Sequence, residues 1–150
     1  MRKTKFLTIF FSLFILLAIA IIGLGLTNKT ISSSQEVISI PLSEISSEAS
    51  WYEYESEKTK IKYFAVRAPD GSIKTAFDAC DVCYKSRRGY SQDGDFMICN
   101  NCGNRYHING LGTENLAGGG CWPGYLENNI KDDNIMIKAS DLKEGGFRFS

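Results

Sequence analysis

Five cysteines carry the chemistry that this sequence most clearly offers. They form two C-x2-C pairs, Cys80 with Cys83 and Cys99 with Cys102, followed by a single Cys121. Fifteen residues separate the two pairs, a spacing within the range of four-thiolate zinc sites. Each C-x2-C turn aims two sulfur atoms at one point, and a hairpin between the turns brings both pairs to one ion. The pattern therefore predicts a metal site built from thiolates.

The cysteines leave several alternatives open. Thiolates suit Zn²⁺, iron or an iron–sulfur cluster, and a fifth thiol exceeds what a structural zinc site needs. Cys121 then replaces one of the paired cysteines, adds a labile fifth ligand, or is a reactive thiol. Disulfides compete with metal binding, because cysteines of an exported chain oxidise readily. His107 is a candidate additional ligand, since imidazole suits zinc, copper and iron, although a strand histidine with a satisfied ring is the simpler interpretation.

The residues before the cysteines predict an exported protein. Residues 1–5 carry three positive charges, and residues 6–26 are apolar and uncharged. A helix of that length spans about 30 Å, the thickness of a bilayer core, and the positive flank stays in the cytoplasm. We predict a signal-anchor helix at 1–26, a flexible tether at 27–35 and an extracytoplasmic domain at 36–150. A cleaved signal peptide, which would release the domain as a secreted protein, is the alternative.

Hydrophobic alternation predicts a mainly β domain after residue 36, with a zinc-ribbon-like hairpin between the two C-x2-C turns. Within 60–66, one face carries Ile61, Tyr63 and Ala65 and the other carries Phe64 and Val66. We expect strands at 36–42, 51–55, 60–66, 72–77, 96–98, 134–138 and 147–149, turns at 69–71 and 92–95, and one helical turn at 140–143. We expect the aromatic core to comprise Trp51, Tyr52, Tyr54, Tyr63, Phe64 and Phe77.

Charge excludes some functions. The chain has 17 Lys and Arg against 17 Asp and Glu, so it lacks the basic excess of a protein that binds nucleic acid through phosphates. Beyond residue 26 it has 14 basic and 17 acidic residues, a net charge of −3. Lys85, Arg87 and Arg88 are interpreted as a solvated loop, with an acidic partner as the alternative.

The cysteine segment resembles a known family. The run AFDACDVCYKSRRGYSQDGDFMICNNCGNRY at 76–106, with GGGC at 118–121, is similar to the DUF2318 family, membrane iron-sulfur proteins with an FtrD-like domain. KIKYFAVRAPDGSIKT before it and IKASDL after it also fit, so the resemblance covers residues 36–150. It implies an iron or iron–sulfur centre near an iron-uptake system with a membrane-embedded iron permease. The metal-site residues that it implies are Cys80, Cys83, Cys99, Cys102 and Cys121.

Two functions follow from these observations. The first is a membrane-anchored extracytoplasmic protein whose Cys-ligated iron or iron–sulfur centre serves iron uptake or electron transfer to a transporter. The second is a structural zinc-ribbon domain that contacts a membrane transporter. Since MRKTK lacks the twin arginine of the export route for folded proteins, we expect the metal to be acquired outside, which favours zinc or a single iron or copper ion over a cluster. An enzyme, such as a thiol–disulfide oxidoreductase, ranks third, because no helix N-terminus is predicted to lower a thiol pKa.

Overall fold

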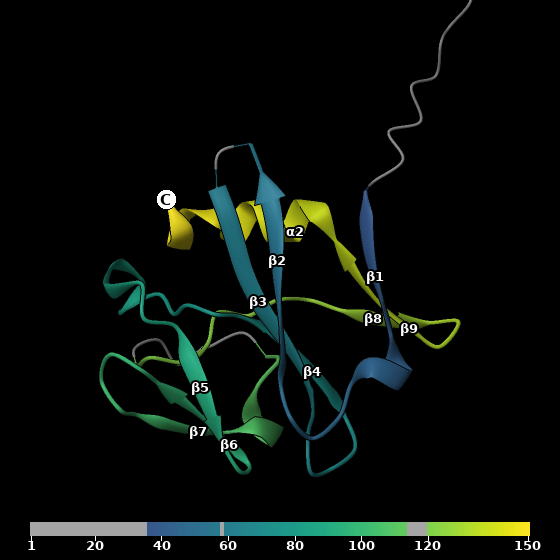
Figure 1. Cartoon of the computed structure of the whole chain (residues 1–150), viewed down its shortest axis with the longest axis horizontal. Helices are drawn as coiled ribbons and strands as arrows, with labels where there is room; N and C mark the ends of the chain where they lie inside the picture. The colour runs from purple at the N-terminus through teal and green to yellow at the C-terminus, as the bar shows by residue number, and fades with distance from the viewer. Residues whose placement is uncertain (1–35, 58, 114–119) are drawn as a thin grey trace, which may run out of the picture. The chain divides into compact units, whose positions relative to one another are not determined.

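Three small antiparallel sheets make up most of the structure (Figure 1). The computed structural model describes residues 36–57, 59–113 and 120–150. The predicted signal-anchor at 1–26 and tether at 27–35 lie outside the described residues. In the part of the chain that is described, no helix has the length and apolar character needed to cross a membrane. The prediction of a mainly β domain is confirmed.

The sheets follow the order β1-β9-β8, β2-β3-β4 and β5-β6-β7. Short elements flank them: η1, Leu42–Glu44; η2, Tyr84–Ser86; η3, Ile108–Gly110; α2, Ala139–Gly145; and η4, Gly146–Phe149. The strands are β1, Val37–Pro41; β2, Ser50–Ser56; β3, Thr59–Arg67; β4, Ile73–Phe77; β5, Tyr90–Asp93; β6, Phe96–Cys99; β7, Arg105–His107; β8, Asn129–Lys131; and β9, Asn134–Lys138.

The β2-β3-β4 sheet lies between two hydrophobic cores. Strand β3 follows the predicted alternation, because Phe64 and Val66 enter one core and Ile61, Tyr63 and Ala65 enter the other. We call the first the thiol-side core and the second the aliphatic core. The thiol-side core contains Phe64, Val66, Ala68, Ala76, Cys80, Tyr90, Met97, Cys99, Tyr106, Ile108, Leu111 and Cys121. The aliphatic core contains Ile40, Ile45, Ile61, Tyr63, Ala65, Phe77, Leu126, Ile135, Ile137 and Leu142.

Both predicted turns are present and fix the strand register. At 69–71 the backbone turns with Gly71 at φ +84°, and the Asp70 carboxylate accepts hydrogen bonds from the N–H (2.9 Å) and hydroxyl (2.5 Å) of Ser72. Asp93 pairs with Phe96 across the second turn, where Gly94 adopts φ +55°. Positive φ strains residues that have a Cβ, so glycine suits both turns. The second turn places the β5–β6 hairpin between the two C-x2-C pairs.

Two predictions of local structure were wrong, and one was right but too short. Residues 147–149 belong to the 3-10 helix η4 rather than a strand, because the Phe149 ring packs on Phe77 and Arg148 is paired with Asp81. The helical turn predicted at 140–143 is present and extends to the helix α2, which buries Leu142 completely. Trp51 is 44% exposed, because β2 is the edge strand of its sheet. Strands β5, β7 and β8 were not among the strands predicted.

Candidate metal centre

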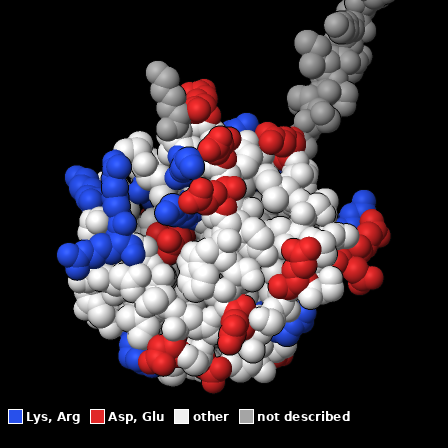
Figure 2. Space-filling view, in the orientation of Figure 1, with Lys and Arg blue, Asp and Glu red and all other residues white. Residues whose placement is uncertain are grey.

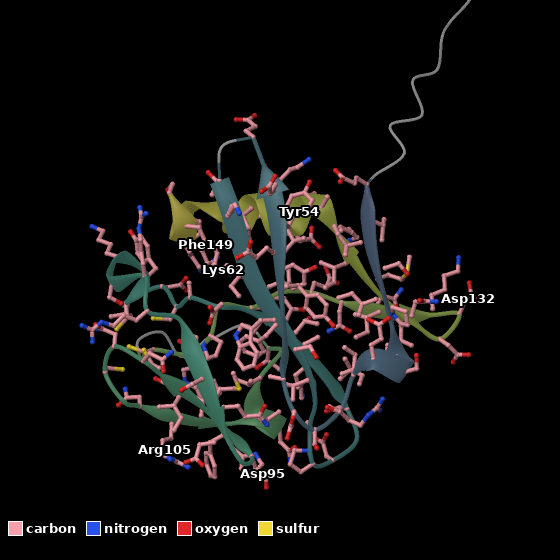
Figure 3. All side chains as sticks on the ribbon, viewed as in Figure 1. Tyr54, Lys62, Asp95, Arg105, Asp132 and Phe149 are labelled. Carbon is pink, nitrogen blue, oxygen red and sulfur yellow. The ribbon has the colours of Figure 1, made fainter. Side chains whose placement is uncertain are left out.

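Four of the five cysteines bring their sulfur atoms together. The Sγ atoms of Cys83, Cys99, Cys102 and Cys121 all lie within 4.8 Å of one another. Figure 3 shows sulfur atoms gathered beside one end of β5. Cys99 and Cys121 are buried, Cys83 is partly buried and Cys102 is exposed. This cluster of Cys83, Cys99, Cys102 and Cys121, the four-sulfur group, is therefore buried on most sides and meets solvent at one edge.

The second C-x2-C turn begins where β6 ends. Cys99 is the last residue of β6, and its carbonyl accepts a hydrogen bond from Gly103 N–H at 2.8 Å. Gly103 adopts φ +74°, which allows this tight turn without a Cβ clash. Burial raises the pKa of the Cys99 thiol, and hydrogen bonds from the backbone of Cys102 and Asn101 oppose that rise. These amides would stabilise a thiolate at this position.

The first C-x2-C turn contributes only one sulfur to the group. Cys83 belongs to the group, whereas Cys80 is buried beside it. The Cys80 sulfur accepts a hydrogen bond from Cys83 N–H at 2.9 Å. Ser86 then closes the turn, since its N–H and hydroxyl donate to the Cys83 carbonyl at 2.9 Å and 2.7 Å. The Cys80 sulfur therefore stabilises the backbone of the first turn.

Cys121 completes the group and is held by two tyrosines. Its N–H donates to the Tyr106 hydroxyl at 2.7 Å, and its carbonyl accepts a hydrogen bond from the Tyr90 hydroxyl. The Tyr106 ring also packs on Trp122, with ring centroids 4.6 Å apart. Both backbone groups of Cys121 are thus satisfied inside the thiol-side core. This clamp sets the position of a sulfur that lies 19 residues after Cys102 in the sequence.

Cys83 and Cys121 form a coupled pair, because their sulfur atoms lie 3.0 Å apart. The Cys121 thiol and then the Asn101 side chain lower the pKa of Cys83, and Asn101 Nδ2 donates to the Cys83 sulfur at 3.3 Å. The Cys83 thiol and then burial raise the pKa of Cys121. The contact therefore favours ionisation of Cys83 over ionisation of Cys121.

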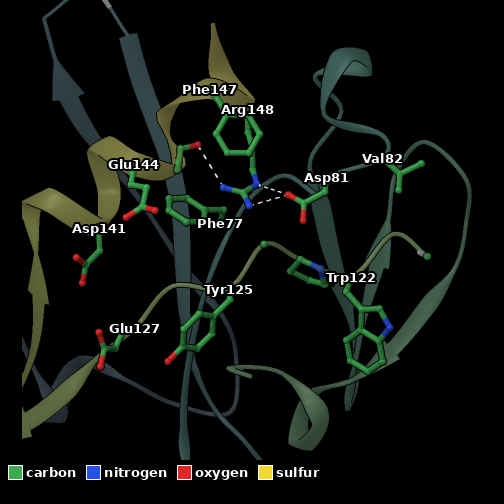
Figure 4. Close-up of a pocket in the computed structure, with 14 residues that line it drawn as sticks. Phe77, Asp81, Val82, Trp122, Tyr125, Glu127, Asp141, Glu144, Phe147 and Arg148 are labelled. Carbon is green, nitrogen blue, oxygen red and sulfur yellow. Dashed lines mark hydrogen bonds and ion pairs between the residues drawn. The ribbon is translucent and has the colours of Figure 1, made fainter. Parts of the chain in front are cut away.

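An ion pair ties the first turn to the C-terminal end of the chain (Figure 4). Asp81 lies between Cys80 and Cys83, and its carboxylate accepts from Arg148 Nε at 2.8 Å, with Nη2 at 2.6 Å. The Arg148 side chain is 12% exposed and stacks on Phe147 and Phe77. Because Phe77 belongs to the aliphatic core, the Arg148 side chain lies between that core and the first C-x2-C turn.

His107 lies outside the four-sulfur group. It ends strand β7, its Nδ1 accepts a hydrogen bond from Asn109 N–H at 3.2 Å, and its ring packs edge-on against Phe96, with centroids 5.1 Å apart. Three residues that were not predicted as part of the site do contact it: Asn101, Tyr90 and Tyr106. Asn101 lies within the CNNC motif, so it was visible in the sequence. The tyrosines had no such signal, because they reach the site only through the pairing of β5 and β7 with β6.

The donor set fits a thiophilic metal ion. Four sulfurs bound tetrahedrally to one ion at about 2.3 Å lie about 3.8 Å apart. The four Sγ atoms of this group lie within 4.8 Å of one another, and those of Cys83 and Cys121 are 3.0 Å apart. Thiolates bind zinc, iron and copper(I) in preference to magnesium or calcium. The arrangement can therefore hold a single metal ion, with amides directed at two of the sulfurs.

Comparison with known families agrees with this chemistry. The family model described as membrane iron-sulfur containing protein FtrD-like matches residues 45–149. The match spans 105 of the 150 residues and includes all five cysteines. No curated protein matches the chain. The chain belongs to the family of membrane iron-sulfur containing FtrD-like proteins.

Proposed function

We propose that this chain holds iron at the thiolates of Cys83, Cys99, Cys102 and Cys121, and that it serves iron uptake or electron transfer to a membrane transporter. The observation that carries the proposal is the convergence of four sulfurs within 4.8 Å in a chain of this family. The N-terminal sequence supports a location on the outer side of the membrane. A membrane-embedded iron permease or another transporter is the partner that we propose.

The protein's own groups suit a centre that accepts and releases charge. Iron bound here would supply one-electron chemistry. The Asn101 side chain donates to the Cys83 sulfur, and backbone amides donate to Cys99, so negative charge on these sulfurs is stabilised. Tyr106 and Tyr90 hold Cys121 from both sides. The exposed Cys102 leaves an edge that a partner can approach.

A structural zinc site is the second candidate. The β5–β6 hairpin lies between the two C-x2-C pairs, and four thiolates suit Zn²⁺ as well as iron. In that case the ion would be redox-silent, and the function would be contact with a membrane transporter. Cys121 would still be a ligand, because its sulfur belongs to the group.

Metal analysis of the full chain distinguishes the two candidates. The protein would be purified in detergent with and without oxygen, and its metal content and absorption spectrum recorded. We expect iron with visible charge-transfer bands that dithionite bleaches. About one zinc per chain without a visible band would instead support the structural site. Absence of metal together with oxidised thiols would overturn both candidates.

A further inference from the structure

A cavity of about 420 Å³ opens beside the four-sulfur group. The buried Cys80 and Cys99 line it, together with the partly buried Cys83. Four exposed cationic side chains line the same cavity: Lys60, Lys62, Arg87 and Arg88. Figure 2 shows blue side chains gathered on the left of the molecule, where Figure 1 places the loop around η2. A ligand entering this cavity from solvent therefore meets positive charge before it reaches the sulfurs.

The two arginines keep their charge available. Lys60 and Lys62 pair with exposed carboxylates at 3.6 Å. No carboxylate of the described ranges lies within 4.0 Å of the guanidinium nitrogens of Arg87 or Arg88. Asp78 is the one carboxylate among the described residues of the cavity wall, and its Oδ1 accepts a hydrogen bond from Tyr90 N–H at 2.7 Å. The cavity is thus electropositive at its exposed side.

The loop that carries the arginines is fixed to the metal centre. Asn100, which directly follows Cys99, donates from Nδ2 to the Arg88 carbonyl and from N–H to the Gly89 carbonyl, both at 3.0 Å. Arg87 itself adopts φ +54°, a left-handed conformation that is unfavourable for a residue with a Cβ. The backbone beside both arginines is therefore held next to the second C-x2-C turn.

We propose that this cavity, next to the four-sulfur group, binds a small anion with several carboxylate groups. A guanidinium matches the geometry of a carboxylate with two parallel hydrogen bonds, and two arginines therefore suit an anion with more than one carboxylate. The concave shape and the volume suit a small molecule rather than the flat face of a protein. If the proposed function holds, such an anion brings its bound iron ion to the thiolates as a chelate.

Citrate binding to the full chain tests the proposal directly. Isothermal titration calorimetry would use the metal-free, reduced protein at low salt, with citrate, inorganic phosphate and acetate as ligands. The test variant is Arg87→Gln with Arg88→Gln, and the matched control is Lys131→Gln with Lys138→Gln, which removes the same charge from the β8–β9 hairpin. We expect the test variant to bind citrate at least about tenfold more weakly than the wild type, and the control to bind it as the wild type does.

Two results would overturn the proposal. One is equal citrate affinity in the two double variants. The other is arginine-dependent binding of phosphate without binding of citrate, which would assign a different class of anion. Because the titration uses metal-free protein, it does not depend on the metal. Loading the same variants with aqueous Fe²⁺ under anaerobic conditions tests the proposed function separately, and we expect both double variants to load as the wild type does.

Discussion

The two faces of the β2-β3-β4 sheet are covered by different kinds of side chain. On one side, isoleucine and leucine side chains from β1, β9 and α2 fill the aliphatic core. On the other side, the thiol-side core includes three cysteines, two tyrosines and a methionine. The aliphatic core is stabilised by burial, which contributes about 25 cal/mol per Å² of apolar area. The thiol-side core also contains buried apolar side chains, and its tyrosines add hydrogen bonds to the backbone of Cys121.

The two sides of the sheet also differ in their apolar contacts and in their access to solvent. The aliphatic side supports the sheet, and its one described ion pair to a C-x2-C turn, Arg148 with Asp81, has an exposed carboxylate. The thiol side has fewer aliphatic contacts and opens to solvent at Cys102. Regions with few buried apolar contacts open more readily. The aliphatic core therefore lies on one face of this sheet, and the candidate metal centre lies on the other.

Metal removal should produce the largest difference between the two sides. Chelation of the metal-loaded full chain, followed by amide hydrogen exchange, should remove protection from β5, β6 and β7 and leave β1 and β9 protected. Structural metal binding contributes on the order of 10 kcal/mol in small zinc domains, so we expect the local opening free energy to fall by several kcal/mol. Equal loss of protection in both regions would contradict the division into two sides.

Gly145→Ala should damage the aliphatic side alone. A Cβ at this position would lie 2.0 Å from Cζ of Phe77, so the buried ring must shift. Overpacking of this kind costs about 1–3 kcal/mol, which urea denaturation would measure, and metal content should not change. Gly146→Ala is the matched control, because its Cβ would meet only the end of the Ile61 side chain, at 3.2 Å. Loss of metal in Gly145→Ala would show that the two sides are not independent.

Tyr106→Phe should weaken the thiol side alone. The change removes the acceptor of the buried Cys121 N–H, and an unsatisfied buried donor costs about 1–3 kcal/mol. We expect metal affinity to fall about tenfold, measured by competition with a chromophoric chelator. Tyr84→Phe, at a partly exposed ring beside Phe147, serves as the control. An unchanged affinity in Tyr106→Phe would mean that the clamp does not position Cys121.

Asp78 should give the smallest effect, visible as a pH dependence. Burial raises its pKa above the ordinary value of 3.8, against hydrogen bonds from Tyr90 and Trp51. The folded chain thus holds this proton more tightly than the unfolded chain does. Its contribution to stability is complete below pH 3.8 and is lost as the pH rises through the folded pKa. Asp78→Asn should reduce that decline in metal-free protein, as followed by urea denaturation across pH, and an unchanged slope would contradict it.

Much of the scaffold could be predicted because its signals are local. Alternation in 60–66 assigned Ile61 and Phe64 to opposite faces correctly, and turn residues located both predicted hairpin turns. The C-terminal residues 147–149 misled the same method, because two phenylalanines two apart resemble a strand. Their true role depends on Phe77 and Asp81, which are distant in sequence. Local periodicity carries no information about such contacts.

The candidate site could be predicted as a set of cysteines but not as a geometry. Spacing favours Cys80, Cys83, Cys99 and Cys102 as one group, because paired C-x2-C turns usually share an ion. The structure gathers Cys121 into the group and leaves Cys80 beside it. Tyrosines on β5 and β7 hold the backbone of Cys121, and their approach to Cys121 depends on sheet register.

Metal stoichiometry in two single variants tests the central claim most directly. Cys80→Ser and Cys121→Ser each remove one thiol of the full chain, and both thiols are buried. Because only Cys121 belongs to the four-sulfur group, Cys80→Ser should retain the wild-type metal content after anaerobic purification, and Cys121→Ser should lose it. Circular dichroism would establish that both variants fold. Retention of metal in Cys121→Ser with its loss in Cys80→Ser would contradict the account.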